Sequence, residues 1–286
     1  MPEAVCCAHA LSRQTAIASA RNLTVSDTTT VRLRGGPWEL DVTPERGGRI
    51  TSLRLGGDEL LDQGLGVDDP EVAGYVAAGA RGWDEMVPNI DPARYPGPGK
   101  WEGVALPDHG EAWRLPWAVT EETAAAVRMD CSGRLLPWRL ERYIELQSGS
   151  VRLEYVYTNA GDGPLYAYWC AHPLFRYEAG MEIDVADGFV MPPRGASAKV
   201  FLQAGSIDHV GLGWPSGSKV DIAWDSSVTP YIAIWACNGD LGGYYHVAIE
   251  PATGGNDRPD PAASPPVLAP GRKLSWWLEI RDRRRL

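Results

Sequence analysis

Apolar and polar residues alternate along short stretches of the chain, most clearly in the run WELDVT at 38–43. A repeat of two residues is typical of a strand with one buried and one exposed face. Turns rich in glycine and proline separate such stretches, for example between 43 and 49. The pattern predicts strands at 38–43, 49–55, 140–146, 151–157, 181–185, 198–202, 219–224, 231–236, 244–249 and 274–280.

The order of these strands predicts the fold class. The turn at 147–150 joins two strands into a hairpin, and we find no internal repeat and very little helix. We therefore expect an all-β protein, a large antiparallel β-sandwich.

Two segments lack the alternating pattern. Residues 62–110 are irregular, with a short helix predicted around 70–80 and dense proline and glycine at 91–100. A long loop in a compact domain is more often functional than idle. Residues 1–26 are rich in alanine and serine but lack the basic start of a secretory signal. We expect a disordered extension there, with an export or transit role as the alternative, and one sandwich domain over 27–286.

Composition excludes several partners. The 286 residues include 27 basic and 37 acidic side chains, a net charge of −10, without a basic stripe. This balance argues against nucleic acid, and no stretch approaches the roughly 20 apolar residues of a membrane span. The five scattered cysteines form no C-x-x-C pair, which favours free thiols in a reducing compartment and a cytoplasmic location.

A histidine stands in the most apolar strand-like run, which extends from 166 to 175. His172 precedes Pro173, and proline holds the preceding residue in an extended conformation. The imidazole could donate a proton to a ring oxygen of a sugar. The alternative is a core histidine bonded to a backbone carbonyl. Cys170 is close in sequence, but we interpret it as a buried structural thiol.

A glutamate follows another apolar run and also precedes a proline. Glu250 comes after Val247, Ala248 and Ile249 and before Pro251. Burial would raise the pKa of this carboxyl group towards the range of a general base. The alternative is a salt bridge to an arginine such as Arg258.

A third candidate is His109, which is flanked by Asp108, Gly110 and Glu111. Either carboxylate could fix its tautomer, and Gly110 would let the backbone approach a ligand closely. A solvated loop histidine is the alternative. Without a second closely spaced histidine we predict no metal site. Asp208 adds a further carboxylate in a predicted loop.

The chain has 12 tryptophans, and indole rings stack on the apolar faces of sugars. Most will pack in the core, and Trp83, Trp113 and Trp169 are the candidates for facing a cleft. The sequence contains no G-x-S-x-G elbow, no phosphate-binding glycine loop before a helix and no dinucleotide fingerprint.

Taken in order, short motifs over 31–280 resemble the aldose 1-epimerase (galactose mutarotase) family. They are Gly47-Gly48-Arg49-Ile50, His109-Gly110, His172-Pro173-Leu174-Phe175, Asp208-His209, Ile249-Glu250 and the run PPVLAPG at 265–271. The resemblance implies a large β-sandwich, a sugar or sugar-like small molecule as the partner, and neither cofactor nor metal.

The resemblance also implies roles. Glu250 matches the general base that takes the proton of the anomeric hydroxyl. His172 matches the general acid that protonates the ring oxygen, so that the C1–O5 bond opens and recloses. His109 and Asp208 match the pair that orients the substrate.

Two departures indicate a divergent member. Relatives usually carry an Asn-Arg-Ile type segment before the first histidine, whereas residues 83–89 contain no arginine. We predict Glu85, Asn89 or Arg94 as sugar contacts in its place. Glu250 precedes Pro251, where galactose-acting members commonly have Thr-Gln.

The sequence thus predicts a cofactor-independent isomerase that interconverts sugar anomers, as a monomer or homodimer. Two alternatives stay open: a carbohydrate-binding protein without turnover, and a lyase, hydrolase or tailoring enzyme acting on a sugar-like metabolite.

Overall fold

The protein is described by a computed structural model that covers residues 29–285 except 98 and 186–187. The segment 1–26, predicted to be a disordered extension, lies outside these residues. Strands dominate the described chain, and its helical elements are the short 3₁₀ turns η1 (Ala112–Arg114), η2 (Pro261–Ala263) and η3 (Arg283–Arg285). None of them has the length and apolarity that crossing a membrane would require, among the residues described.

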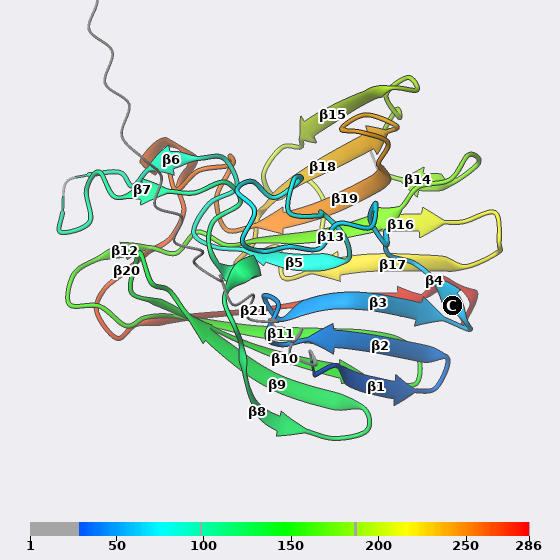
Figure 1. Cartoon of the computed structure of the whole chain (residues 1–286), viewed down its shortest axis with the longest axis horizontal. Helices are drawn as coiled ribbons and strands as arrows, with labels where there is room; N and C mark the ends of the chain where they lie inside the picture. The colour runs from blue at the N-terminus through cyan, green and yellow to red at the C-terminus, as the bar shows by residue number, and fades with distance from the viewer. Residues whose placement is uncertain (1–28, 98, 186–187, 286) are drawn as a thin grey trace, which may run out of the picture.

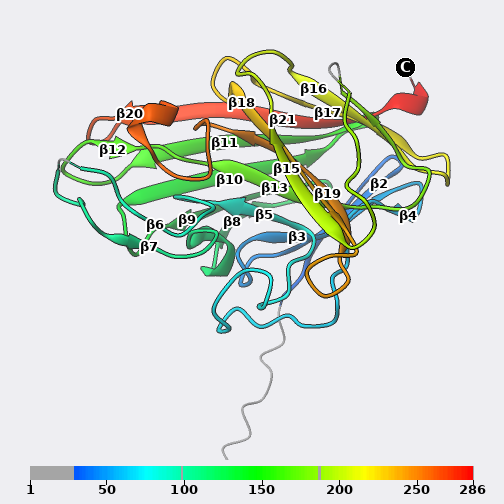
Figure 2. The same cartoon turned by 90° about the horizontal axis from the view of Figure 1, so that it is seen from above.

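Two large sheets face each other (Figures 1 and 2). The described part of the first has nine strands, in the order β1 (Val31–Gly35), β2 (Trp38–Thr43), β3 (Arg49–Leu55), β5 (Trp83–Met86), β13 (Cys170–Arg176), β19 (Tyr245–Ala252), β18 (Tyr231–Asn238) and β15 (Ala196–Phe201), with β4 (Asp58–Glu59) paired to β3.

The second sheet has eight strands within the same residues. Their order is β14 (Glu182–Asp184), β16 (His209–Gly213), β17 (Lys219–Trp224), β21 (Lys273–Asp282), β11 (Ser150–Asn159), β10 (Trp138–Leu146), β9 (Ala126–Ser132) and β8 (Ala118–Glu122). Two small ribbons pair β6 (Ala93–Arg94) with β7 (Ala105–Leu106), and β12 (Leu165–Tyr166) with β20 (Val267–Leu268).

The predicted antiparallel sandwich is confirmed. In β10, buried and half-buried residues alternate over the whole strand, as expected when one face packs on the opposite sheet. The predicted hairpin is also present, with Leu146 of β10 opposite Val151 of β11. The inward faces of both sheets supply the main hydrophobic core, which includes Trp138, Leu153 and Trp276.

β13 departs from alternation because both of its faces are covered. Its residues are buried from Cys170 to Phe175. One face packs on the opposite sheet, and the loops between β4 and β8 lie against the other (Figure 2). A strand enclosed in this way sits at the centre of the first sheet, between β5 and β19.

Two predictions about the connecting segments were wrong. Residues 70–80 form turns instead of a helix. Gly79 has φ +101°, and a Cβ atom there would lie 2.0 Å from the carbonyl oxygen of Val67, so this chain path requires glycine. The irregular region also contains β5, whose four residues are all buried and therefore carry no alternating signal.

Candidate active site

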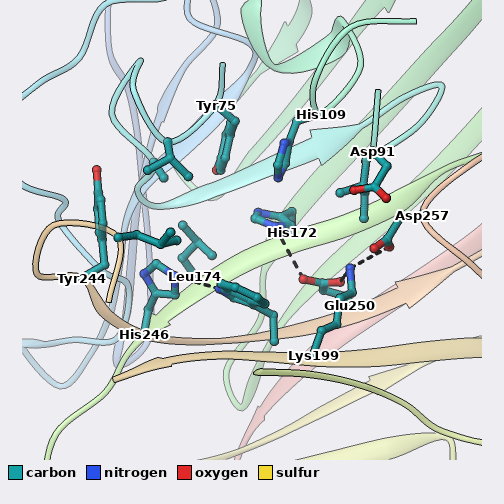
Figure 3. A pocket seen from close by; sticks show the side chains of 15 residues that line it. Tyr75, Asp91, His109, His172, Leu174, Lys199, Tyr244, His246, Glu250 and Asp257 are labelled. Atoms are coloured by element: carbon teal, nitrogen blue, oxygen red, sulfur yellow. Dashed lines mark hydrogen bonds and ion pairs between the residues drawn. The ribbon is translucent and has the colours of Figure 1, made fainter. Parts of the chain in front are cut away.

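His172 and Glu250 meet on neighbouring central strands. β13 and β19 are antiparallel, and their register pairs Leu174 with Ala248 and Cys170 with Ala252, so His172 lies beside Glu250. The His172 Nε2 atom is 3.5 Å from the Glu250 Oε1 atom (Figure 3). Both residues are almost completely buried, with exposed fractions of 5% and 1%. The fold thus joins two residues that are 78 positions apart in the chain.

These side chains form the floor of a cavity of about 230 Å³ on the outer face of the first sheet. The volume is below the roughly 300–1,000 Å³ usual for drug-sized ligands, so the space suits a single sugar ring. The cavity is lined by Tyr75, Val76, Ala80, Ile90, Asp91, His109, His172, Leu174, Lys199, Trp235, Leu241, Tyr244, His246, Glu250 and Asp257.

Glu250 is held by a lysine from the edge of the sheet. The Nζ atom of Lys199, on β15, lies 2.7 Å from Glu250 Oε2 and 2.7 Å from Asp257 Oδ1. Burial raises the pKa of Glu250 above its usual value, and the Lys199 ammonium opposes this rise. Burial also works against the charge of Lys199, but the two carboxylates outweigh it and raise the lysine pKa. The predicted alternative partner, Arg258, instead pairs with Asp91.

The surroundings of His172 favour the neutral imidazole. Burial, followed by the nearby positive charges that His109 and Lys199 can carry, holds the pKa of His172 well below its usual range. The imidazole also packs edge-on against Tyr75, with ring centroids 5.2 Å apart. A depressed imidazole pKa beside a raised carboxyl pKa is typical of a proton-transfer pair.

His109 is fixed by its own turn. Its Nδ1 atom is 2.9 Å from the Asp108 carboxylate, which indicates that Nδ1 carries the proton. Its ring stacks on Tyr75 at 4.4 Å and meets His172 edge-on at 5.3 Å. The glycine that follows lies against the chain itself: a Cβ on Gly110 would be 2.3 Å from the carbonyl oxygen of Val87.

Tyr75 is anchored through Asp84, a residue that sequence reasoning overlooked. The Tyr75 hydroxyl donates to Asp84 Oδ2 at 2.9 Å, and Arg49 Nε lies 3.0 Å from each Asp84 oxygen. Asp84 pairs with His172 across β5 and β13, so both side chains face the same way. A buried Arg–Asp pair therefore supports the wall of the cavity.

Three predicted site residues lie on the opposite face. The side chains of a strand alternate between its two faces. Because Asp84 and His172 face the cavity side, Trp83 and Glu85 beside Asp84, and Trp169 three positions before His172, point between the two sheets. All three are fully buried. Glu85 accepts hydrogen bonds from Arg142 at 2.9 Å and from the indole of Trp169 at 2.8 Å. We therefore assign these residues to the core.

Four further predicted residues are placed elsewhere. Asn89 is buried and donates to the carbonyls of Asp91 and Pro107, which shapes the loop. Arg94 is exposed and donates to the carbonyl of Gly103. Trp113 packs behind Tyr75, at 5.1 Å between ring centroids. Asp208 is exposed, pairs with His209 and precedes β16 in the second sheet, so it does not orient a ligand with His109.

Sequence reasoning missed several lining residues, among them Lys199, Asp257 and His246. The Nδ1 atom of His246 lies 2.7 Å from Asp62, and its Nε2 accepts from the indole of Trp235 at 3.1 Å. His246 does stand four residues before Glu250, on the same face of β19. That even spacing was the available signal, whereas Lys199 stands alone in its strand.

No protein-family model and no curated protein matches the chain. Solved structures do: a protein from Synechocystis sp. aligns with a TM-score of 0.71 and 17% identity, over 90% of this chain and 98% of that one. A candidate aldose 1-epimerase from Escherichia coli K12 aligns with a TM-score of 0.67 and 16% identity, over 88% of this chain and 98% of that one. A galactose mutarotase related enzyme from Lactobacillus acidophilus aligns with a TM-score of 0.65 and 15% identity, over 89% of this chain and 97% of that one. The chain therefore has the galactose mutarotase-like fold, as the sequence motifs implied.

Proposed function

We propose that this chain, on its galactose mutarotase-like sandwich, is a cofactor-independent isomerase that interconverts the anomers of a sugar. One observation carries the proposal: His172 and Glu250, 3.5 Å apart, form the floor of a cavity the size of one sugar ring. An imidazole and a carboxylate in these positions can serve the two proton transfers that ring opening needs.

The proposed reaction balances with two groups. Glu250 takes the proton of the anomeric hydroxyl while a carbonyl forms at C1 and the C1–O5 bond breaks. His172 delivers a proton to O5. Rotation about C1–C2 and the reverse transfers close the ring as the other anomer, so neither group ends the cycle changed.

This scheme requires one proton on the His172–Glu250 pair. The proton starts on the imidazole for ring opening, although burial disfavours the imidazolium. A bound substrate expels water from the cavity, and the lower dielectric strengthens the attraction between the His172 imidazolium and the Glu250 carboxylate. We assign His109 to orienting the substrate, because Asp108 holds its tautomer and Tyr75 supports its ring.

The direct test is the approach of a single dissolved anomer to equilibrium, followed by optical rotation or by proton NMR, with and without protein. Acceleration over buffer supports the isomerase. Sugar binding in calorimetry without acceleration would instead identify a binding protein. Cleavage or elimination products in the NMR spectrum would identify a different chemistry at the same pair.

We predict an acidic pH optimum for kcat/KM. The free enzyme is active only with one proton on the pair, and the His172 pKa lies well below its usual range. As pH rises through the upper pKa of the pair the last proton leaves, and as pH falls through the lower pKa the carboxylate is neutralised. Buffer-corrected rates between about pH 4 and pH 9 should form a bell centred below pH 7. A profile that rises steadily to pH 9 contradicts the scheme.

Replacing Lys199 with methionine is expected to move the alkaline limb of that profile upward by about 1–3 pH units. The ammonium 2.7 Å from Glu250 favours the ionised carboxylate, and its loss raises the pKa of Glu250 further. Lys199→Arg keeps the charge and should keep the limb near its original position. An unchanged limb in Lys199→Met would show that the pair does not control the rate.

A further inference from the structure

The two ends of the cavity differ in chemistry. Glu250, Asp257, Asp91 and Lys199 gather at one end, and Tyr244 and His246 lie at the other, with His172 between them (Figure 3). Strand register explains this division. Ala248 of β19 pairs with Leu174 of β13 on one side and with Trp235 of β18 on the other. Leu174 and Ala248 are each two positions along their strands from His172 and Glu250, on the same face of the sheet.

The side-chain nitrogen atoms at the second end already have partners. The indole N–H of Trp235 donates to His246 Nε2, so the proton of His246 is on Nδ1 and points to Asp62. The hydroxyl oxygen of Tyr244 accepts from the backbone N–H of Ala80. A substrate hydroxyl placed beside Leu174 and Trp235 would lose its water without gaining a protein partner.

This apolar end begins directly beside the proposed acid. Leu174 follows His172 by two residues on the same face of β13, a step of about 6.6 Å. In a pyranose, O5 is bonded to C5, and C5 carries the C6 group. When O5 meets His172, C6 is the exocyclic carbon nearest to O5, and it falls towards Leu174 and Tyr244.

The charged end does not favour an anionic sugar. Among the described lining residues, Lys199 is the one lysine or arginine, and it is shared between Glu250 and Asp257. The third lining carboxylate, Asp91, pairs with Arg258. A phosphate or carboxylate on the substrate would meet carboxylates and no unpaired cation, which favours an uncharged substrate.

Building on the proposed function, we infer that the substrate is a 6-deoxyhexose, whose C6 methyl group occupies the end of the cavity lined by Leu174, Trp235 and Tyr244. A hexose in which C6 is a hydroxymethyl group fits the same volume but leaves the C6 hydroxyl without a hydrogen-bond partner. An apolar pocket discriminates against an added hydroxyl by up to about 100-fold.

The test compares sugars that differ only at C6: D-fucose with D-galactose, 6-deoxy-D-glucose with D-glucose, and L-rhamnose with L-mannose. The kcat/KM for anomer exchange is measured by NMR, and binding by calorimetry. We expect the deoxy member of the accepted pair to be favoured by about 10–100-fold in kcat/KM. Equal or better turnover of the hydroxymethyl partner overturns the inference and leaves the isomerase standing.

The two proposals fail separately. Tighter binding of a deoxy sugar without any acceleration supports the apolar subsite and removes the isomerase. Absence of both binding and acceleration for all six sugars overturns both.

Two polar variants and one control locate the preference. Leu174→Gln places an amide beside C6 and is expected to reduce the deoxy preference about 10-fold, whereas Leu174→Met, of similar volume, should keep it. Because Leu174 is 1% exposed, its glutamine variant could fail to fold. Ala80→Ser adds a single hydroxyl at the same end and should reduce the preference in the same direction. A preference unchanged in every folded polar variant overturns the inference.

Discussion

Glu250→Gln is expected to lower kcat/KM for anomer interconversion by about 10²–10⁴-fold, the usual contribution of a general base. The amide keeps the size of the side chain but cannot take the anomeric proton. The substitution also removes the charge that pairs with Lys199 at 2.7 Å and with His172 at 3.5 Å. Initial rates of optical rotation, corrected for buffer, measure the effect.

His172→Asn supplies the companion measurement. Because the two residues act on one substrate as a unit, the double variant should be only slightly slower than the slower single variant. Asp208→Asn is the control, since Asp208 is exposed and lies in the loop before β16 of the second sheet, whereas the cavity floor is on the first sheet. Glu250→Gln with more than half the normal rate would remove Glu250 from the mechanism.

Arg142→Met is expected to destabilise the fold by about 3–5 kcal/mol, because it leaves the Glu85 carboxylate buried without its cation. The Arg142 and Glu85 side chains are both 0% exposed, and their charged groups are 2.9 Å apart. Tyr155 and Trp169 also donate to Glu85, at 2.9 and 2.8 Å. This loss is a large part of the roughly 5–15 kcal/mol that stabilises a typical domain. Urea unfolding at pH 7 measures it.

The double variant Arg142→Met/Glu85→Leu separates the charge from the packing. It removes both ions and should recover much of the lost stability. The pH dependence gives a second check. Burial raises the pKa of Glu85, and Arg142 opposes the rise, so the single variant has a still higher folded-state pKa. Its deficit should therefore shrink as pH falls and the carboxyl group takes up a proton, and grow as pH rises. A deficit independent of pH would point to lost packing alone.

The alternating pattern predicted the sandwich and most of its strands, because β10, β11 and β21 each have one inward face. It failed at β5, where Trp83 to Met86 are buried on both faces. Without alternation the sequence does not distinguish Asp84 from Glu85, and a shift of one residue exchanges the two faces of a strand. Asp84 supports the cavity wall and Glu85 lies in the core.

Some residues of the candidate site could be predicted from the sequence, and others could not. His172, Glu250 and His109 stand in apolar or glycine-containing motifs that a reader of the sequence can find, and the fold brings all three to one cavity. Lys199 and Asp257 carry no such motif. Lys199 reaches Glu250 only because β15, β18 and β19 are adjacent in the sheet, and Asp257 pairs with the same ammonium from the loop after β19. That order of strands is a property of the complete fold.

The position of Lys199 has a consequence for how the site responds to local motion. Among the described residues β15 ends the first sheet and is hydrogen-bonded to β18 alone. Edge strands open more readily than interior ones, and an opening of β15 would carry the ammonium away from Glu250, whose carboxylate is on an interior strand. Fraying of the edge strand β15, two strands from β19, would therefore change the pKa of Glu250 and with it the charge of the pocket.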